Sequence, residues 1–154
     1  MIIEHNEALQ AEVLKQQKIK KALELSEQKF KIAFNANPSI MLIANYETND
    51  IIEVNQTFLQ TLGYTREEVR HRTTADLELF NDIKVRDKLI ERLKNDNSVA
   101  NAEAVLRRKD GGLLPVLISA EYILINDEKC YISVITDISE RKRFEETIRT
   151  VNKR

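Results

Sequence analysis

The last third of the chain contains three strand-like segments separated by two short polar turns, and this arrangement constrains the fold more than any other feature. The turns are K-D-G-G at residues 109–112 and N-D-E-K at residues 126–129. Connections this short join antiparallel strands, because a parallel pair needs a crossover of a dozen residues or more. Residues 99–137 are therefore predicted to form a three-stranded antiparallel meander.

Both faces of this predicted meander carry apolar residues. Within the middle strand, Val116, Ile118 and Ala120 alternate with Leu117 and Ile123. A sheet with one wet face would alternate more cleanly between apolar and polar side chains. We therefore expect the second face to be covered, either by the N-terminal helix or by a partner chain.

Two further strands are predicted nearer the start of the chain. The segments S-I-M-L-I-A-N (39–45) and I-I-E-V (51–54) are separated by the turn Y-E-T-N-D. Apolar, β-branched segments on either side of a polar turn are typical of a β-hairpin. The chain is therefore predicted to contain five strands in two groups.

Helix signals fill the chain between the hairpin and the meander. Asn55 is placed to cap a first helix that Gly63 ends, and Thr65 and Glu68 form a T-x-x-E capping box for a second. A third helix is predicted over residues 82–94, with either Asn81 or Asp82 as its cap. Because the strands fall into two groups separated by helices, the pattern indicates an α+β fold.

The N-terminal segment, residues 1–34, contains neither glycine nor proline and is rich in strong helix formers. Pro38 ends this predicted helix, because proline lacks the amide hydrogen and disfavours helical geometry at the residue before it. Apolar residues at roughly heptad spacing indicate a coiled coil, and packing on the chain's own domain is an alternative of equal weight. The residues expected to support dimerisation are Leu9, Val13, Ile19, Leu23 and Phe30.

The segment T-D-I-S-E-R-K (136–142) ends the last strand and opens a charged helix over residues 139–154. Asp137 and Glu140 have the spacing of a D-x-x-E capping box, so the strand converts to a helix with almost no loop. One apolar stripe on this helix is expected to pair with a second copy, and a solvated tail is the alternative. The stripe consists of Phe144, Ile148 and Val151.

Composition and motif content exclude several function classes. The 24 Lys and Arg residues balance 25 Asp and Glu, so no charge excess indicates nucleic acid or an anionic membrane as a partner. The single cysteine fits a reducing compartment, and no apolar run approaches the ~20 residues of a membrane helix. No catalytic or metal-binding motif occurs. We expect a cytoplasmic chain that is not an enzyme, although its parent protein can be anchored in a membrane.

Four segments, in this order and spacing, carry a resemblance to a known family. They are F-K-I-A-F-N-A-N-P-S-I (30–40), I-I-E-V-N-Q-T-F-L-Q-T-L-G-Y-T-R-E-E (51–68), L-R-R-K-D-G-G (106–112) and T-D-I-S-E-R-K (136–142). With them, residues 30–146 resemble the PAS family of sensor domains. The chain departs from the family's closing Asp-Ile-Thr motif, because Ser139 stands in place of the threonine.

The resemblance implies a PAS fold, in which a five-stranded antiparallel sheet carries short helices on one face and an amphipathic helix flanks each end. It divides the chain into an N-terminal coiled-coil helix (1–34), a PAS domain (35–138) and a linker helix (139–154) that leads to an output domain outside this chain. Signal relay is assigned to the strand-to-helix junction. The relay residues are Asp137, Ser139 and Glu140.

The resemblance also implies a signalling role. The expected parent is a two-component histidine kinase, with a cyclic-dinucleotide enzyme as the alternative. The chain would act as a homodimer with neighbouring sensor and effector domains. Because both ends are helical and lack a terminating signal, we expect a fragment of a longer protein rather than a free-standing adaptor.

Cofactors of the family can be checked residue by residue. Haem-binding members take a histidine from the helix before the meander, but residues 82–94 contain none, and His5 and His71 lie elsewhere. Photoactive flavin members carry a reactive cysteine just before that helix, whereas Cys130 is in the last strand. The resemblance therefore disfavours haem and a photoactive flavin, and it leaves a redox flavin open.

A ligand pocket, if the core is not filled, is expected between the inner face of the sheet and the helices. Because no inward Arg or Lys is identified there, the expected ligand is apolar rather than a carboxylate. A ligand-free module that only dimerises and relays is the alternative. The predicted pocket residues are Leu42, Val54, Phe58, Leu62, Leu77, Leu89, Leu93, Ala104, Val116, Ile118, Ile132 and Val134.

Overall fold

The structure is a computed structural model, and it describes residues 2–152. Residues 1, 153 and 154, at the outer ends of the two predicted flanking helices, lie outside the described residues. None of the helices in the described part of the chain is long and apolar enough to cross a membrane.

The chain divides into two compact units, and the first comprises residues 1–35. Helix α1 (Ile2–Ala36) occupies it and ends two residues later than predicted, directly before Asn37 and Pro38. The helix presents apolar side chains to solvent. Among them are all the residues expected to support dimerisation in this segment, namely Leu9, Val13, Ile19, Leu23 and Phe30.

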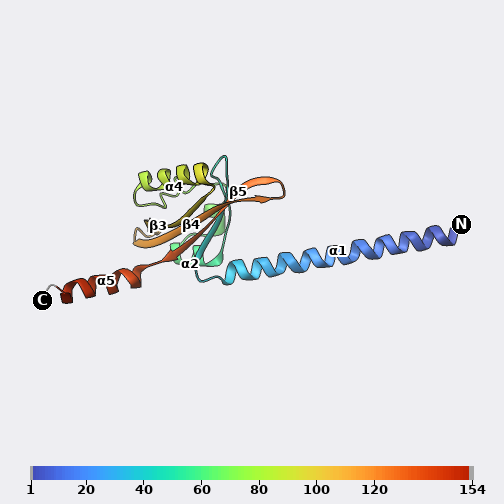
Figure 1. Ribbon diagram of the computed structural model, residues 1–154, viewed down its shortest axis with the longest axis horizontal. Coiled ribbons are helices and arrows are strands. Elements are labelled where there is room, and N and C mark those ends of the chain that lie inside the picture. Colours follow the sequence, from blue (N-terminus) through green and yellow to red (C-terminus); the bar gives the residue numbers. More distant parts are fainter. Residues whose placement is uncertain (1, 153–154) are drawn as a thin grey trace. The chain divides into compact units, whose positions relative to one another are not determined.

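The second unit, residues 36–154, is built on a five-stranded antiparallel sheet (Figure 1). The strands are β1 (Ile40–Asn45), β2 (Ile51–Val54), β3 (Ser98–Arg107), β4 (Leu113–Ile125) and β5 (Glu128–Asp137). Their order in the sheet is β2-β1-β5-β4-β3, so the predicted hairpin and the predicted meander are both confirmed. The two groups are joined by pairing of β1 with β5, in which Ile40 lies opposite Ile135.

Three helices follow the hairpin, and the local signals predicted for them are confirmed. They are α2 (Gln56–Leu62), α3 (Arg66–Val69) and α4 (Ile83–Asp96). The Asn55 side chain accepts a hydrogen bond from the Phe58 amide at 3.0 Å, and Gly63 ends α2 in the left-handed conformation with φ of 85°. Thr65 and Glu68 form the capping box of α3.

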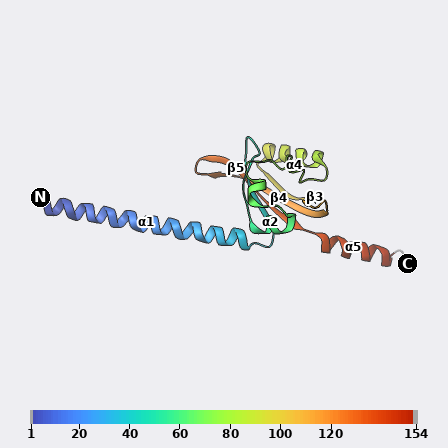
Figure 2. The ribbon, with the colours of Figure 1, turned by 180° about the vertical axis from the view of Figure 1, so that it is seen from behind.

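The core lies between these helices and one face of the sheet, which we call the inner face. Phe58 and Leu62 of α2 and Leu93 of α4 are at most 3% exposed, and all three belong to one apolar cluster with the strands. Figure 2 shows α2 in front of the sheet, and Figure 1 shows α4 alongside β3 and β4. The inner face of the sheet is therefore the face that packs against α4.

The side chains of β5 that face the core differ from those predicted, so the phase of its alternation is shifted by one residue. Ile132 and Val134 are predicted to face the core, but they lie on the outer face of the sheet, where both are half-buried. The inward residues are Tyr131, Ser133 and Ile135. Because β5 carries apolar residues on both faces, hydrophobicity alone does not define its phase. The pairing with β1, which sets the buried Leu42 opposite Ser133, does define it.

Helix α5 (Ser139–Asn152) follows β5 directly, as predicted, but it begins with a different cap. The Asp137 carboxylate accepts a hydrogen bond from the Ser139 amide at 2.8 Å rather than from the Glu140 amide, so the predicted D-x-x-E box does not form. The backbone stays paired with the sheet beyond Asp137, because the amide of the buried Ile138 donates to a β4 carbonyl at 3.0 Å. The helix therefore begins only after Ile138.

Candidate functional site

A cavity of about 50 Å³ lies between α4 and the inner face of the sheet. Its wall comes from α4, from the segment before α4 and from strands β1, β3, β4 and β5. Four of the predicted pocket residues line it, namely Leu42, Leu89, Leu93 and Ile118. A cavity of this size exceeds the ~10–15 Å³ that one water needs but is far smaller than the ~300–1,000 Å³ of drug-sized ligand pockets.

The other predicted pocket residues lie elsewhere. Four of them fill the core and are at most 1% exposed, namely Val54, Phe58, Leu62 and Val116. Leu77 packs against this core and is partly buried, whereas Ala104 lines a separate groove near α5. Ile132 and Val134 lie on the outer face of the sheet.

Four buried polar side chains that the sequence reasoning did not identify also line the cavity. They are Thr74, Arg86, Tyr131 and Ser133. Arg86 is an inward cation, so the expectation of a pocket without one is wrong. A signal for it was present, because Arg86 stands three, four and seven residues before Leu89, Ile90 and Leu93, on the apolar stripe of α4.

The Arg86 guanidinium is held by two neighbours. Its Nε donates to Thr74 Oγ1 at 2.6 Å, and its Nη1 donates to Asp87 Oδ1 at 3.2 Å. Burial raises the pKa of Tyr131 to about 12, and the positive charge of Arg86 acts on that pKa in the opposite direction. The cation and the phenol are thus close enough to interact electrostatically.

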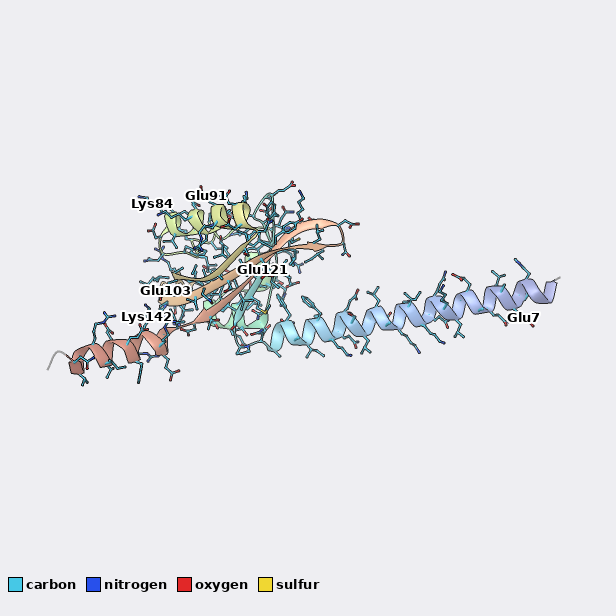
Figure 3. The ribbon with its side chains drawn as sticks, viewed as in Figure 1. Glu7, Lys84, Glu91, Glu103, Glu121 and Lys142 are labelled. Atoms are coloured by element: carbon cyan, nitrogen blue, oxygen red, sulfur yellow. The ribbon has the colours of Figure 1, made fainter. Side chains whose placement is uncertain are left out.

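A second region lies at the root of α5, where one acidic side chain of the sheet binds two basic side chains of the helix. Glu103 on β3 accepts hydrogen bonds from Arg141 Nη2 at 2.9 Å and from Lys142 Nζ at 3.2 Å. Figure 3 shows Glu103 and Lys142 near one another where α5 leaves the sheet. A groove of about 360 Å³ borders these ion pairs and is lined by both Glu103 and Lys142. Side-chain charge therefore adds to the backbone in holding α5 to the sheet.

The predicted relay residues lie at this root. Asp137 and Ser139 are joined by the capping hydrogen bond, whereas Glu140 is exposed and does not complete the box. Farther along α5, the predicted apolar stripe is 44–66% exposed. It consists of Phe144, Ile148 and Val151.

The histidine and cysteine side chains considered above as cofactor ligands lie outside the cavity lining. Among residues 2–152, no group of three or more His, Cys, Asp and Glu side chains could hold a metal ion. His5 and His71 are exposed. Cys130 lies on the outer face of β5, and burial raises the pKa of its thiol.

A model of the PAS domain family matches residues 38–140, which is more than half of the chain. The chain belongs to the PAS domain family. The resemblance noted in the sequence is thereby confirmed, and the five-stranded antiparallel sheet with flanking helices is the PAS fold.

The chain is similar to a curated protein and to solved PAS structures. It is 28% identical over 128 residues to the methyl sulfide methyltransferase-associated sensor of Methanosarcina acetivorans, and the match covers 80% of this chain but 12% of that protein. The PAS domain of an HTR-like protein from Haloarcula marismortui has a TM-score of 0.67 at 23% identity, with 79% of this chain and 99% of that chain covered. The LOV domain of a blue-light activated histidine kinase from Erythrobacter litoralis EL346 has a TM-score of 0.56 at 23% identity, with 66% and 97% covered.

These likenesses support a sensory role in signalling for this PAS domain. The structural matches show the fold alone. Because LOV domains are flavin-binding members of the family, the preference against a flavin stays a prediction. The homodimer, the coiled coil and the cytoplasmic location also stay predictions.

Proposed function

We propose that this chain is a non-catalytic sensory and dimerisation module of a larger signalling protein, with a histidine kinase as the first candidate for the parent. Membership of the PAS family and similarity to a named sensor support this proposal. A cyclic-dinucleotide enzyme is the other candidate parent. In both cases the chain passes the state of its cavity through α5 to an effector domain in the cytoplasm.

The observation that carries this proposal is the short path from the cavity to α5. Ile118 lines the cavity, and its neighbour Leu117 pairs with Glu103 across β4 and β3. Glu103 in turn binds Arg141 and Lys142 in the first turn of α5. A shift of β4 beside the cavity would therefore move Glu103 through its pairing with Leu117, and Glu103 binds α5 directly. Such a coupling lets a ligand bias the position of a connecting helix.

Hydrogen exchange of the α5 amides tests this coupling in the 154-residue chain. Glu103→Gln removes the negative charge, and the exchange rates in the first turns of α5 are expected to rise by roughly two- to fivefold, as for exposed ion pairs. Glu91→Gln is the matched control, because Glu91 is an exposed carboxylate of α4 without an ion pair in the described part of the chain (Figure 3). Equal α5 exchange in all three proteins would contradict the coupling.

Dimerisation through the flanking helices is the second part of the proposal. Both α1 and α5 expose apolar residues that a second copy could cover. Deletion of the residues before Gln28 is expected to raise the dimer dissociation constant by at least about tenfold. Sedimentation equilibrium measures this change, and an unaltered constant would remove α1 from the dimer interface.

A ligand-free relay is the second candidate function, because much of the predicted pocket is filled core. Native mass spectrometry of freshly purified protein, with visible absorption of the same sample, separates the two candidates. Retained extra mass would support a sensor, and colour would identify a chromophore such as a flavin. Protein without added mass would support the relay.

A further inference from the structure

The polar wall of the cavity contains a buried cation with unused donor capacity. Arg86 is only 8% exposed, and its Nη2 group donates no hydrogen bond within residues 2–152. The carboxylate beside it, Asp87, has a side chain that is 63% exposed. A buried guanidinium is costly unless its charge and its donors are matched. Arg86 is therefore prepared to bind an anion.

Two hydroxyl groups lie on the facing strand. Tyr131 and Ser133 point inward from the same face of β5, and both line the cavity. They are 7% and 6% exposed, and neither hydroxyl makes a hydrogen bond within the described part of the chain. The cavity thus combines a guanidinium with two hydroxyl donors. A carboxylate fits this set, because its two oxygens accept about four hydrogen bonds.

The remaining wall is apolar, and the space is small. Aliphatic side chains that include Leu42, Leu89, Ile90, Val99 and Ile118 supply it. The volume of about 50 Å³ is well below the ~150 Å³ of an apolar cavity known to take benzene.

We propose that this cavity binds a short aliphatic monocarboxylate of roughly two to four carbons, with its carboxylate on Arg86, Tyr131 and Ser133 and its hydrocarbon on the apolar wall. The proposal rests on the proposed function in one respect: the bound monocarboxylate is taken to be the ligand that the domain senses. It replaces the apolar ligand expected from the sequence. A purely apolar occupant would make no hydrogen bond to the Arg86 Nη2 group or to either hydroxyl.

Titration of the 154-residue chain by two-dimensional NMR tests the proposal. Sodium propionate is the probe, and propionamide, with the same shape and no charge, is the matched ligand control. Propionate is expected to give saturable shifts in α4 and β5. Propionamide is expected to bind at least about tenfold more weakly, because it lacks the charge-assisted hydrogen bonds to Arg86. Sodium chloride at equal ionic strength is expected to give no saturable shifts.

Variants then assign the binding to the polar wall. Arg86→Gln is expected to weaken propionate binding by at least about tenfold. Arg92→Gln is the matched control, because Arg92 is exposed on the same helix, and its affinity for propionate should equal that of the parent. Tyr131→Phe removes a single hydroxyl and is expected to weaken binding by several-fold. This milder variant tests the site even if Arg86→Gln fails to fold.

Four results would overturn the ligand class. They are no saturable propionate binding, equal affinity for propionamide, competition by chloride at the same concentration, and unchanged affinity in folded Arg86→Gln. The relay is judged separately. If propionate fails to bind while Glu103→Gln still loosens α5, the ligand class is wrong and the relay stands. If propionate binds but α5 exchange does not change, the ligand class stands and the relay fails.

Discussion

Helices α4 and α5 have 14 residues each and mix charged with apolar residues, yet they meet the sheet in different ways. Helix α4 packs on the inner face and buries Arg86 and Leu93. Helix α5 buries none of its residues and is bound to Glu103 through its first turn. Figure 1 shows α4 alongside the strands and α5 extending from their end.

In the proposed function, this difference separates the sensing side of the domain, at α4, from its output side, at α5. The contacts of α4 are largely apolar and buried. Their loss would therefore lower the stability of the fold, and they hold α4 against the sheet. The contacts of α5 are exposed ion pairs and a few backbone hydrogen bonds, which small changes can rearrange. An exit helix that is weakly held can transmit a signal, whereas a helix that closes a cavity must remain in place.

Truncation of one buried residue is expected to give the largest contrast between the helices. Leu93→Ala should lower the free energy of unfolding by about 2–5 kcal/mol, because Leu93 is 3% exposed in the core. Ile148→Ala on α5, where Ile148 is 44% exposed, should change it by less than about 0.5 kcal/mol. Urea unfolding of both variants measures the contrast. An equal loss of unfolding free energy in the two variants would contradict the contrast between the helices.

Alkaline pH is expected to destabilise the fold by ionising Tyr131, which lines the cavity beside α4, and the effect is intermediate in size. The pKa of Tyr131 is raised from 10.0 to about 12, chiefly by burial, so the folded state holds the phenol proton more tightly than the unfolded chain does. Because the folded pKa is the higher one, this stability is complete below about pH 10 and is lost as the pH rises towards about 12. The loss approaches about 2–3 kcal/mol at its limit.

Urea unfolding of the parent and of Tyr131→Phe between about pH 9 and about pH 11.5 checks this prediction. The variant has no phenol to ionise, so it should lose less stability over this range than the parent. Parallel pH profiles would show that the Tyr131 phenol does not resist ionisation in the folded state.

Of the two helices, α5 is expected to respond more strongly to salt, and this effect is the smallest. The paired side chains of Glu103, Arg141 and Lys142 are 42–51% exposed, so dissolved ions screen their attraction. Raising sodium chloride from about 0.05 to about 1 M should raise exchange rates in the first turn of α5 by about twofold. Amides in the middle of α4 provide the internal reference. An equal salt response in both helices would contradict the proposed division.

Much of the fold could be predicted because its signals are local. Asn55, Gly63 and the Thr65 capping box each act within a few residues, so the sequence at those points defines the element. The turn at residues 109–112 likewise needs a left-handed residue, and Gly111 supplies it with φ of 93°. Strand pairing then followed from the short connections.

The unpredicted features depend on partners that are distant in sequence. The phase of β5 is set by pairing with β1, and apolar residues on both of its faces concealed it. The inward position of Arg86 depends on Thr74 and on the strands opposite α4. The Asp137 cap changed because Ile138 stays paired with β4, which sequence spacing does not reveal.

Filling the cavity without any ligand tests most directly whether its state controls α5. Ala120 lines the cavity and is 7% exposed, so Ala120→Val adds hydrocarbon there. Hydrogen exchange would be compared in the parent, in Ala120→Val and in the double variant Ala120→Val with Glu103→Gln. We predict that Ala120→Val changes α5 exchange by several-fold and that Glu103→Gln abolishes this change. A folded Ala120→Val protein with altered exchange in α4 and unchanged exchange in α5 would contradict the account.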